Sequence, residues 1–238
     1  IVFVMGALIL FLAPGNDKRY IAETATWFPG FNLLSIKDHL YIGVIWFFNK
    51  FIIEMQYIHL LISALAIIAF YRASEKTNRI QSIALSVFTI MFLTAVFTTI
   101  TQDFSLLSDF NMIKNFDFSY GVINFWRMNP DFWVSLIPYA FWSLYFIMLW
   151  YIIFILTDKS VFIVLTLLAS IATMAVMFLS PTLYASGSRV LTVATVLILL
   201  VIIHIFVRFN LLSYKITWVI FVTFSALNIF TLFFSWVI

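Results

Sequence analysis

Cysteine is absent from this 238-residue chain, and charged residues make up only 10% of it. Without cysteine there is no disulfide framework and no thiolate ligand for a metal. Hydrophobic residues account for 64% of the sequence, so a water-soluble domain of this size would lack the polar residues to cover its core. The composition therefore excludes soluble enzymes, and it excludes disordered chains because those are rich in polar and charged residues.

Sequence motifs of soluble enzymes are missing as well. There is no glycine-rich phosphate loop, no His-Glu-x-x-His zinc motif and no Gly-x-Ser-x-Gly nucleophile motif, and the chain has three histidines. We therefore expect neither a metal ion nor a cofactor. The net charge of +3 is too small to predict nucleic acid as a partner.

Long apolar runs are what the sequence has in abundance. A helix needs about 20 apolar residues to cross a bilayer. The runs that are long enough cover residues 51–71, 80–101, 132–156, 160–180, 190–207 and 216–238. A shorter run over residues 1–13 is interpreted as the end of a further span, in a piece of a longer protein. The sequence thus predicts an all-α, multi-pass transmembrane bundle of about seven spans, the first truncated, in one domain over residues 1–238.

The distribution of charges in the loops predicts the orientation of these spans. Three short loops contain Arg72, Lys76, Arg79, Lys159, Arg208 and Lys215, against the acids Glu75 and Asp158. Basic residues in short loops favour the cytoplasmic side of a membrane. The remaining loops are longer and their acidic and basic residues balance, so we expect them to face outward.

Two of the outer segments do not have the composition of simple connectors. Residues 33–49 combine charges with a short aromatic run, which predicts an interfacial helix that turns into the next span at Phe51. The long loop over residues 102–131 alternates acids with large apolar side chains. We expect this loop to rest against the membrane or the protein.

Polar breaks occur at the predicted outer ends of two spans. In the first, Pro14 and Gly15 end the apolar run and Asn16, Asp17, Lys18 and Arg19 follow. Backbone N–H groups beside two cations suit an anion such as a phosphate. The alternative is a helix end whose Lys and Arg side chains reach the lipid head groups, which the local pattern alone favours.

The second polar break covers residues 180–189 and contains Tyr184, Ser188 and Arg189. Arg189 precedes a helix, where a cation opposes the helix dipole unless an anion is bound nearby. An ordinary hairpin with Arg189 as a membrane anchor is the alternative. We predict that Arg19 and Arg189 converge on one outer-facing pocket, which requires an anion or an acid between them. Asp17 and Glu54 are the candidate acids, and Glu54 either closes the outer cavity or pairs with Lys50, Arg19 or Arg189.

The two breaks carry a resemblance to a known family. A small-Pro-Gly-Asn sequence followed by Arg, and a later Ser-Pro hairpin ending in Arg, resemble glucosyltransferase-like bacterial envelope proteins and C-type glycosyltransferases that use polyprenyl-phosphate sugars. The matching residues are Pro14, Gly15, Asn16, Arg19, Ser180, Pro181 and Arg189. The resemblance implies a catalytic acid in an early outer loop, upstream of Ile1.

The resemblance implies a protein of the bacterial cytoplasmic membrane that handles a lipid-linked sugar phosphate at the outer leaflet, in cell-envelope polysaccharide synthesis or modification. Its partners would be a polyprenyl-phosphate-linked sugar, or another lipid phosphate, and membrane lipids. The phosphate would bind Asn16, Lys18, Arg19, Tyr184, Ser188 and Arg189. A transporter or flippase of polysaccharide units and a non-catalytic membrane subunit are the alternatives, so enzymatic activity stays open. A transporter would place charges deep in the bilayer.

Overall fold

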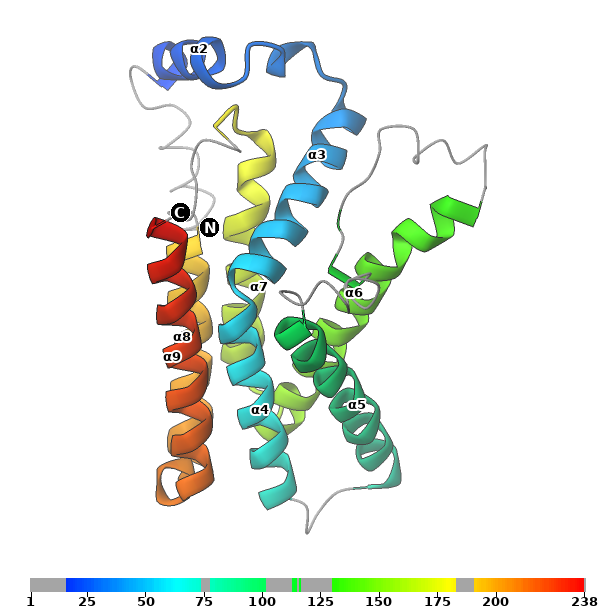
Figure 1. Ribbon diagram of the computed structural model, residues 1–238, viewed down its shortest axis with the longest axis vertical. Coiled ribbons are helices and arrows are strands. Elements are labelled where there is room, and N and C mark those ends of the chain that lie inside the picture. Colours follow the sequence, from blue (N-terminus) through cyan, green and yellow to red (C-terminus); the bar gives the residue numbers. More distant parts are fainter. Residues whose placement is uncertain are drawn as a thin grey trace.

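The computed structural model (Figure 1) describes residues 16–73, 78–101, 113–114, 116, 130–182 and 191–237. Within these ranges the chain is all-α. The α-helices are α2 (Asn16–Trp27), α3 (Ile36–Phe48), α4 (Gln56–Arg72), α5 (Arg79–Thr101), α6 (Pro130–Leu156), α7 (Val161–Ala175), α8 (Leu191–Arg208) and α9 (Lys215–Val237). Short 3-10 helices are η1 (Phe31–Leu33), η5 (Val176–Leu179) and η7 (Leu211–Ser213), and η2 (Asn49–Glu54) is a π-helix.

Several of these helices have the length and composition of membrane spans. Arg79–Thr101, Trp133–Leu156, Val161–Phe178 and Leu191–Arg208 each qualify alone, and the bent pair Ile36–Glu54 and Gln56–Arg72 qualifies together. Lys215–Leu227 is apolar but shorter. The all-α prediction is therefore confirmed, and four or five helices have the length and composition to cross a membrane. The full set of about seven spans is not confirmed, and residues 1–13 lie outside the described part.

The bundle has two distinct ends, as the predicted alternation of loops requires. At the lower end in Figure 1, α4, α6 and α8 end and α5, α7 and α9 begin. Side-chain contacts hold this end together: Arg208 forms an ion pair with Asp158, and Arg72 donates to the backbone carbonyls of Phe209 and Asn210. The short loops predicted to share one side of the membrane thus belong to the same end of the bundle.

Cysteine labelling will establish which end faces the cytoplasm. We expect Thr26→Cys, on an exposed position of α2, to react with a membrane-impermeant maleimide on intact cells. Ser213→Cys, at the exposed last residue of η7, should react only after permeabilisation, because basic short loops stay in the cytoplasm. The chain has no cysteine of its own, so each variant reports one site. Labelling of Ser213→Cys in intact cells would show that this end of the bundle faces outward and that the predicted orientation is wrong.

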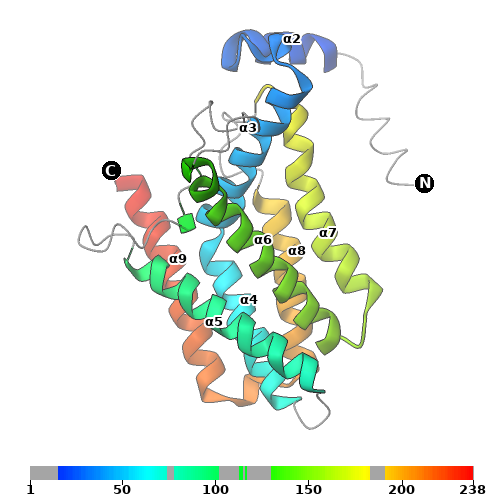
Figure 2. The ribbon, with the colours of Figure 1, turned by 90° about the vertical axis from the view of Figure 1, so that its right-hand side faces the viewer.

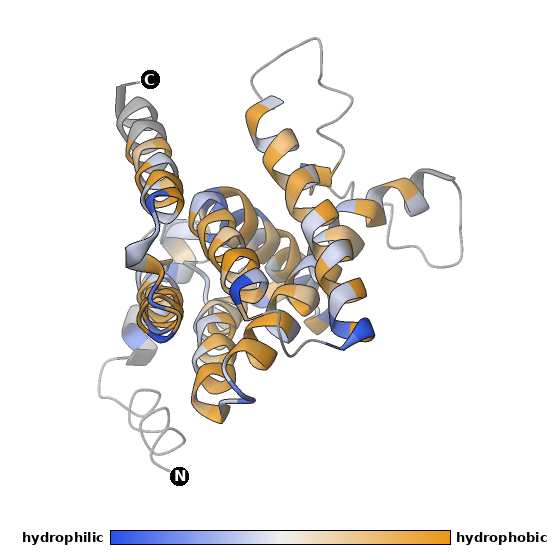
Figure 3. Ribbon diagram, turned by 90° about the horizontal axis from the view of Figure 1, so that it is seen from below, coloured by the Kyte–Doolittle hydropathy of each residue, from blue (hydrophilic) through white to orange (hydrophobic). Residues whose placement is uncertain are grey.

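Helix α4 lies in the middle of the bundle and contacts α5, α6, α8 and α9. Its side chains are buried on nearly all sides, and the small residues Ala66 and Ala69 are fully buried. Small residues let neighbouring helices approach closely, which stabilises helix packing in lipid. On the outer faces of the bundle, large apolar side chains such as Ile90, Ile147 and Ile203 are exposed, as expected where lipid is the solvent. The helices are hydrophobic along most of their length (Figure 3).

The segment predicted to be an interfacial helix forms a helix, and it turns before the next span. Helix α3 covers most of residues 33–49, and the axis changes by 65° between Ile36–Glu54 and Gln56–Arg72. The turn falls at Met55 and not at Phe51, because the π-helix η2 extends the first arm by six residues. The helix that lies across the end of the bundle is α2, while α3 runs obliquely beside α7 (Figures 1 and 2).

Candidate functional site

The described part of the first predicted break, from Asn16 onward, is the start of a helix. Asn16 begins α2, so Asp17, Lys18 and Arg19 belong to its first turn. An acid such as Asp17 is favoured in a first turn because it interacts with the positive end of the helix dipole. Lys18 is exposed. The side chains of Asn16, Asp17 and Arg19 lie outside the described residues.

Aromatic contacts fix α2 across the end of the bundle. The Tyr20 hydroxyl donates to Asn32 Oδ1 at 2.8 Å, and the Tyr20 ring meets the edge of Phe31 with 6.5 Å between centroids. Phe31 is buried and also contacts the ring of His39, 4.4 Å away. Phe31 therefore joins α2 to α3, and the direction of α2 follows from the direction of α3.

The start of α3 is fixed by a capping box. Ser35 Oγ accepts from the Asp38 backbone N–H at 3.3 Å, and Asp38 Oδ2 accepts from the Ser35 backbone N–H at 3.1 Å. Two of the N–H groups that a helix start leaves unpaired are satisfied in this way. These hydrogen bonds fix the residue at which α3 begins after η1. They therefore help to define the turn from α2 into α3.

Helix α3 is joined in turn to the end of α7. Gly43 is buried and lies against the ring of Phe178 in η5: a Cβ added at Gly43 would come within 2.5 Å of Phe178 Cγ. Just beyond Phe178, Ser180 Oγ and Thr182 Oγ1 are 2.8 Å apart, at the start of the second predicted break. The two breaks are therefore at the same end of the bundle and are connected through α3.

Residues of the second break that were predicted to bind phosphate are Tyr184, Ser188 and Arg189. They lie outside the described residues, so their distance from Lys18 and Arg19 stays a prediction. Glu54 is described, and it forms an ion pair with Lys50 one turn earlier in η2. The pairing of Glu54 with Lys50, one of the predicted alternatives, is confirmed. The role of Glu54 as an acid between Arg19 and Arg189 stays a prediction, because the side chains of both arginines lie outside the described residues.

A polar cluster in the bundle was not predicted from the sequence. Lys114 Nζ donates to Gln56 Oε1 and to Thr99 Oγ1, both at 2.8 Å. Gln56 is the first residue of α4 and is buried, and Thr99 is buried near the end of α5. A lysine from the long outer loop is thus held between two helices, next to the bend between α3 and α4.

Neighbouring loop residues are held by helix α6. Trp142 Nε1 donates to the Ile113 carbonyl at 2.8 Å, and the Tyr139 hydroxyl donates to the Phe116 carbonyl at 2.9 Å. Phe116 is buried against the rings of Phe48 and Tyr139. For these loop residues, the prediction that the outer loop rests against the protein is confirmed.

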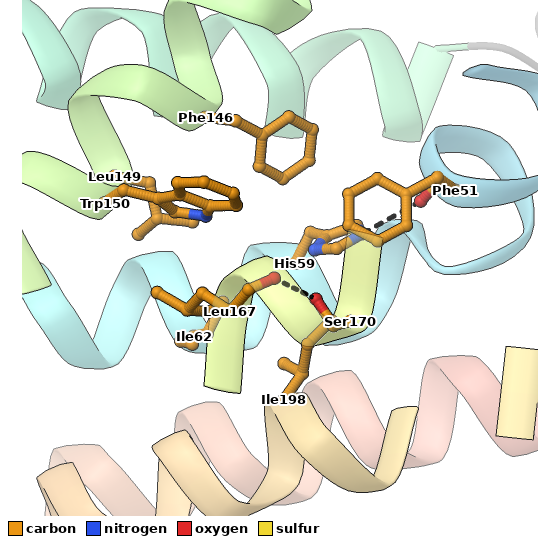
Figure 4. A pocket seen from close by; sticks show the side chains of 9 residues that line it. All are labelled: Phe51, His59, Ile62, Phe146, Leu149, Trp150, Leu167, Ser170 and Ile198. Atoms are coloured by element: carbon orange, nitrogen blue, oxygen red, sulfur yellow. Dashed lines mark hydrogen bonds between the residues drawn. The ribbon is translucent and has the colours of Figure 1, made fainter. Parts of the chain in front are cut away.

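A second buried polar group surrounds His59 (Figure 4). His59 Nε2 lies 2.8 Å from the carbonyl of Phe51, a residue of the π-helix η2. Two serines, Ser63 and Ser170, donate to backbone carbonyls nearby, and Tyr145 donates to Ser63 Oγ at 2.6 Å. These bonds satisfy polar groups that the apolar interior would otherwise leave unpaired.

The cavity beside His59 is too small for a sugar or a lipid head group. It is lined mainly by apolar residues, among them Phe51, Phe146 and Ile198, and leaves about 10 Å³ for the centre of a water molecule. That is close to the minimum for one bound water. In the described part of the chain no group of three His, Asp or Glu residues could hold a metal ion.

Ligand binding is therefore best supported at the end of the bundle that carries the first turn of α2 and the residues after η5. This end has an exposed cation, a helix N-terminus and hydroxyl groups. Phosphate oxygens are bound by such groups in many proteins. Comparison of the chain with protein family models, with curated proteins and with solved structures finds no match.

Proposed function

We propose that this protein binds a lipid-linked sugar phosphate at the end of the bundle that carries α2, and that it acts in the synthesis or modification of cell-envelope polysaccharide in the bacterial cytoplasmic membrane. The proposal depends on one observation: the first turn of α2 and the Ser180–Thr182 turn are connected through α3 at the same end of the bundle. This connection supports a single site that draws on both cation-bearing breaks of the sequence.

The chemistry of this end suits a ligand with a phosphate and an apolar tail. The first turn of α2 offers unpaired backbone N–H groups and the positive end of a helix dipole, which attract anions. Below α2, the exposed side chains Ile36, Leu40 and Val44 form an apolar stripe along α3, where an isoprenoid chain can lie. In this arrangement Arg19 and Arg189 bind the phosphate, with Lys18, Asn16 and the hydroxyls of Tyr184 and Ser188 around it.

As a glycosyltransferase-like protein, the chain would bind the polyprenyl phosphate that leaves when the sugar is transferred. Negative charge increases on that phosphate as its bond to the sugar breaks, so two guanidinium groups would stabilise the leaving group. The base that activates the acceptor hydroxyl would come from a carboxylate upstream of Ile1, as the resemblance implies.

A transporter of polysaccharide units is a second candidate, and the cluster around Lys114 favours it. Helix breaks with polar groups inside a bundle are typical of substrate sites in transporters. Here the α3–α4 bend brings Gln56 beside Lys114 and Thr99. A transporter would need Lys114 for movement of the substrate, whereas a protein that works at the outer surface would need Arg19 and Arg189.

Binding of polyprenyl phosphate to the full-length protein in nanodiscs will test the proposal. We expect Arg19→Gln and Arg189→Gln each to weaken binding about tenfold, since one charge-assisted contact contributes on the order of 1.5 kcal/mol or more. The double variant should lose less than the product of the two effects, because both residues bind one phosphate. Arg79→Gln, the same change at the opposite end of the bundle, is the control.

Unchanged affinity in both Arg19→Gln and Arg189→Gln would refute the proposed site. An equal loss of affinity in Arg79→Gln would show that polyprenyl phosphate binding depends on the overall charge of the protein and not on this site. A flux assay in proteoliposomes separates the two candidate functions: loss of transport in Lys114→Met, with polyprenyl phosphate binding intact, would favour the transporter.

A further inference from the structure

The end of the bundle opposite to α2 carries a concentration of positive charge. Arg72, Arg79, Lys159, Arg208 and Lys215 are all exposed there. Among the described residues at this end, Asp158 is the acid, and it forms an ion pair with Arg208. Positive charge therefore remains in excess around this end, which we call the basic rim.

Arg72 shows how the basic rim is built. Its guanidinium donates to the carbonyls of Phe209 and Asn210 and lies over the ring of Tyr214, 4.7 Å from the centroid. These partners are neutral, so they position the guanidinium without cancelling its charge. The contact also brings the end of α4 next to Lys215 at the start of α9, and so places two cations of the rim on neighbouring helices.

Large apolar side chains are exposed near three cations of the rim. Ile80 follows Arg79, Phe162 follows Lys159 after three residues, and Ile216 follows Lys215, each at least 60% exposed. A cation with exposed apolar surface beside it fits a molecule with an anionic head and acyl chains. Neither a soluble anion nor an acidic protein would cover the apolar part.

We infer that the basic rim binds the head groups of anionic phospholipids, with their acyl chains on the adjoining apolar helix faces. This site is separate from the proposed sugar phosphate site, because it lies at the other end of the bundle. Near a membrane surface, each Lys or Arg attracts anionic lipid, and the attraction decreases over about 10 Å at 0.1 M salt. Several cations around one end of a bundle therefore enrich such lipids around it.

Lipid selectivity measured by electron spin resonance will test this inference. The full chain is reconstituted in phosphatidylcholine, and spin-labelled phosphatidylglycerol is compared with spin-labelled phosphatidylcholine as the probe. We expect phosphatidylglycerol to associate several-fold more strongly with the native protein. In Lys159→Gln/Lys215→Gln this preference should fall to half or less. Both lysines are exposed and the contacts that hold the rim together do not involve their side chains, so the helical circular dichroism signal should be unchanged.

A matched variant at the other end provides the control. Lys37→Gln removes an exposed lysine of α3 that does not belong to the proposed sugar phosphate site, and it should keep most of the preference. Added inorganic phosphate should reduce selectivity no more than chloride at the same ionic strength, which distinguishes lipid head groups from free phosphate. No preference in the native protein, an unchanged preference in Lys159→Gln/Lys215→Gln, or an equal fall in both variants would overturn the inference.

Discussion

Replacing Gly43 by leucine should separate α3 from the end of α7. A Cβ at this position would lie 2.5 to 2.8 Å from three atoms of the Phe178 ring, and the rest of a leucine would need the space that the ring fills. Overpacking of a closely fitted site costs about 1–3 kcal/mol, and we expect Gly43→Leu to reach the top of that range. The measurement is thermal or denaturant-induced unfolding of the purified protein in detergent.

Two further variants give this result its controls. Gly30→Ala places a Cβ where nothing lies within 4 Å, so its stability should change little. Phe178→Ala combined with Gly43→Leu should recover part of the lost stability, since the two residues compete for one volume and their effects are not additive. If Gly43→Leu alone were as stable as the native protein, the contact between α3 and η5 would not be closely packed.

Truncation of Trp142 to alanine should destabilise the bundle by about 3–5 kcal/mol, the range for large aromatic residues in a core. Trp142 is 1% exposed, contacts the rings of Phe141, Tyr145 and Phe146, and donates to the Ile113 carbonyl. The variant therefore loses packing in α6 and also an attachment of the loop. Unfolding measurements report the first effect, and limited proteolysis between α5 and α6 reports the second.

The two effects of Trp142 can be separated. Trp142→Phe keeps most of the packing but loses the indole N–H, so we expect a loss of about 1 kcal/mol together with faster proteolysis. Trp133→Ala, on the same helix at a position that is 55% exposed, should change stability by less than either. If Trp142→Ala were as stable as Trp133→Ala, the aromatic cluster would not contribute to the fold.

Spans bounded by charges were predicted most accurately. The predicted span 80–101 corresponds to Arg79–Thr101, and the predicted span 190–207 corresponds to Leu191–Arg208. Arg79 and Arg208 limit these helices because a charged side chain inside the hydrocarbon region is costly. Such boundaries are visible in hydropathy alone, which depends on local sequence.

Helix α2 was not predicted because it has no apolar run. Its sequence NDKRYIAETATW is polar, and its place depends on the contacts of Tyr20 with Phe31 and Asn32. Similarly, nothing near Lys114 in the sequence indicates that Gln56 and Thr99 lie beside it, since the contacts depend on how α4 and α5 pack. Features of this kind follow from tertiary structure.

For the candidate site, the sequence placed both breaks at one end of the bundle, and their described parts, the first turn of α2 and residues 180–182, lie at that end. The convergence of Arg19 with Arg189 stays a prediction, to be tested by the binding experiment. Glu54 pairs with Lys50, which was one of the predicted alternatives, and its role beside the two arginines stays a prediction. Lys50 and Glu54 are four residues apart, so their pairing could be predicted from the sequence. The π-helical turn that contains both residues could not.

The π-helix between α3 and α4 also governs how this chain can change in evolution. An α-helix rotates its side chains by about 100° per residue, so loss of one residue from Asn49–Glu54 would turn α3 by that angle about its own axis. Gly43 would leave Phe178, and the exposed stripe of Ile36, Leu40 and Val44 would swing toward the protein. Substitutions in η2 are therefore easier to accommodate than insertions or deletions, and homologous sequences should keep the length of this segment even where its residues differ.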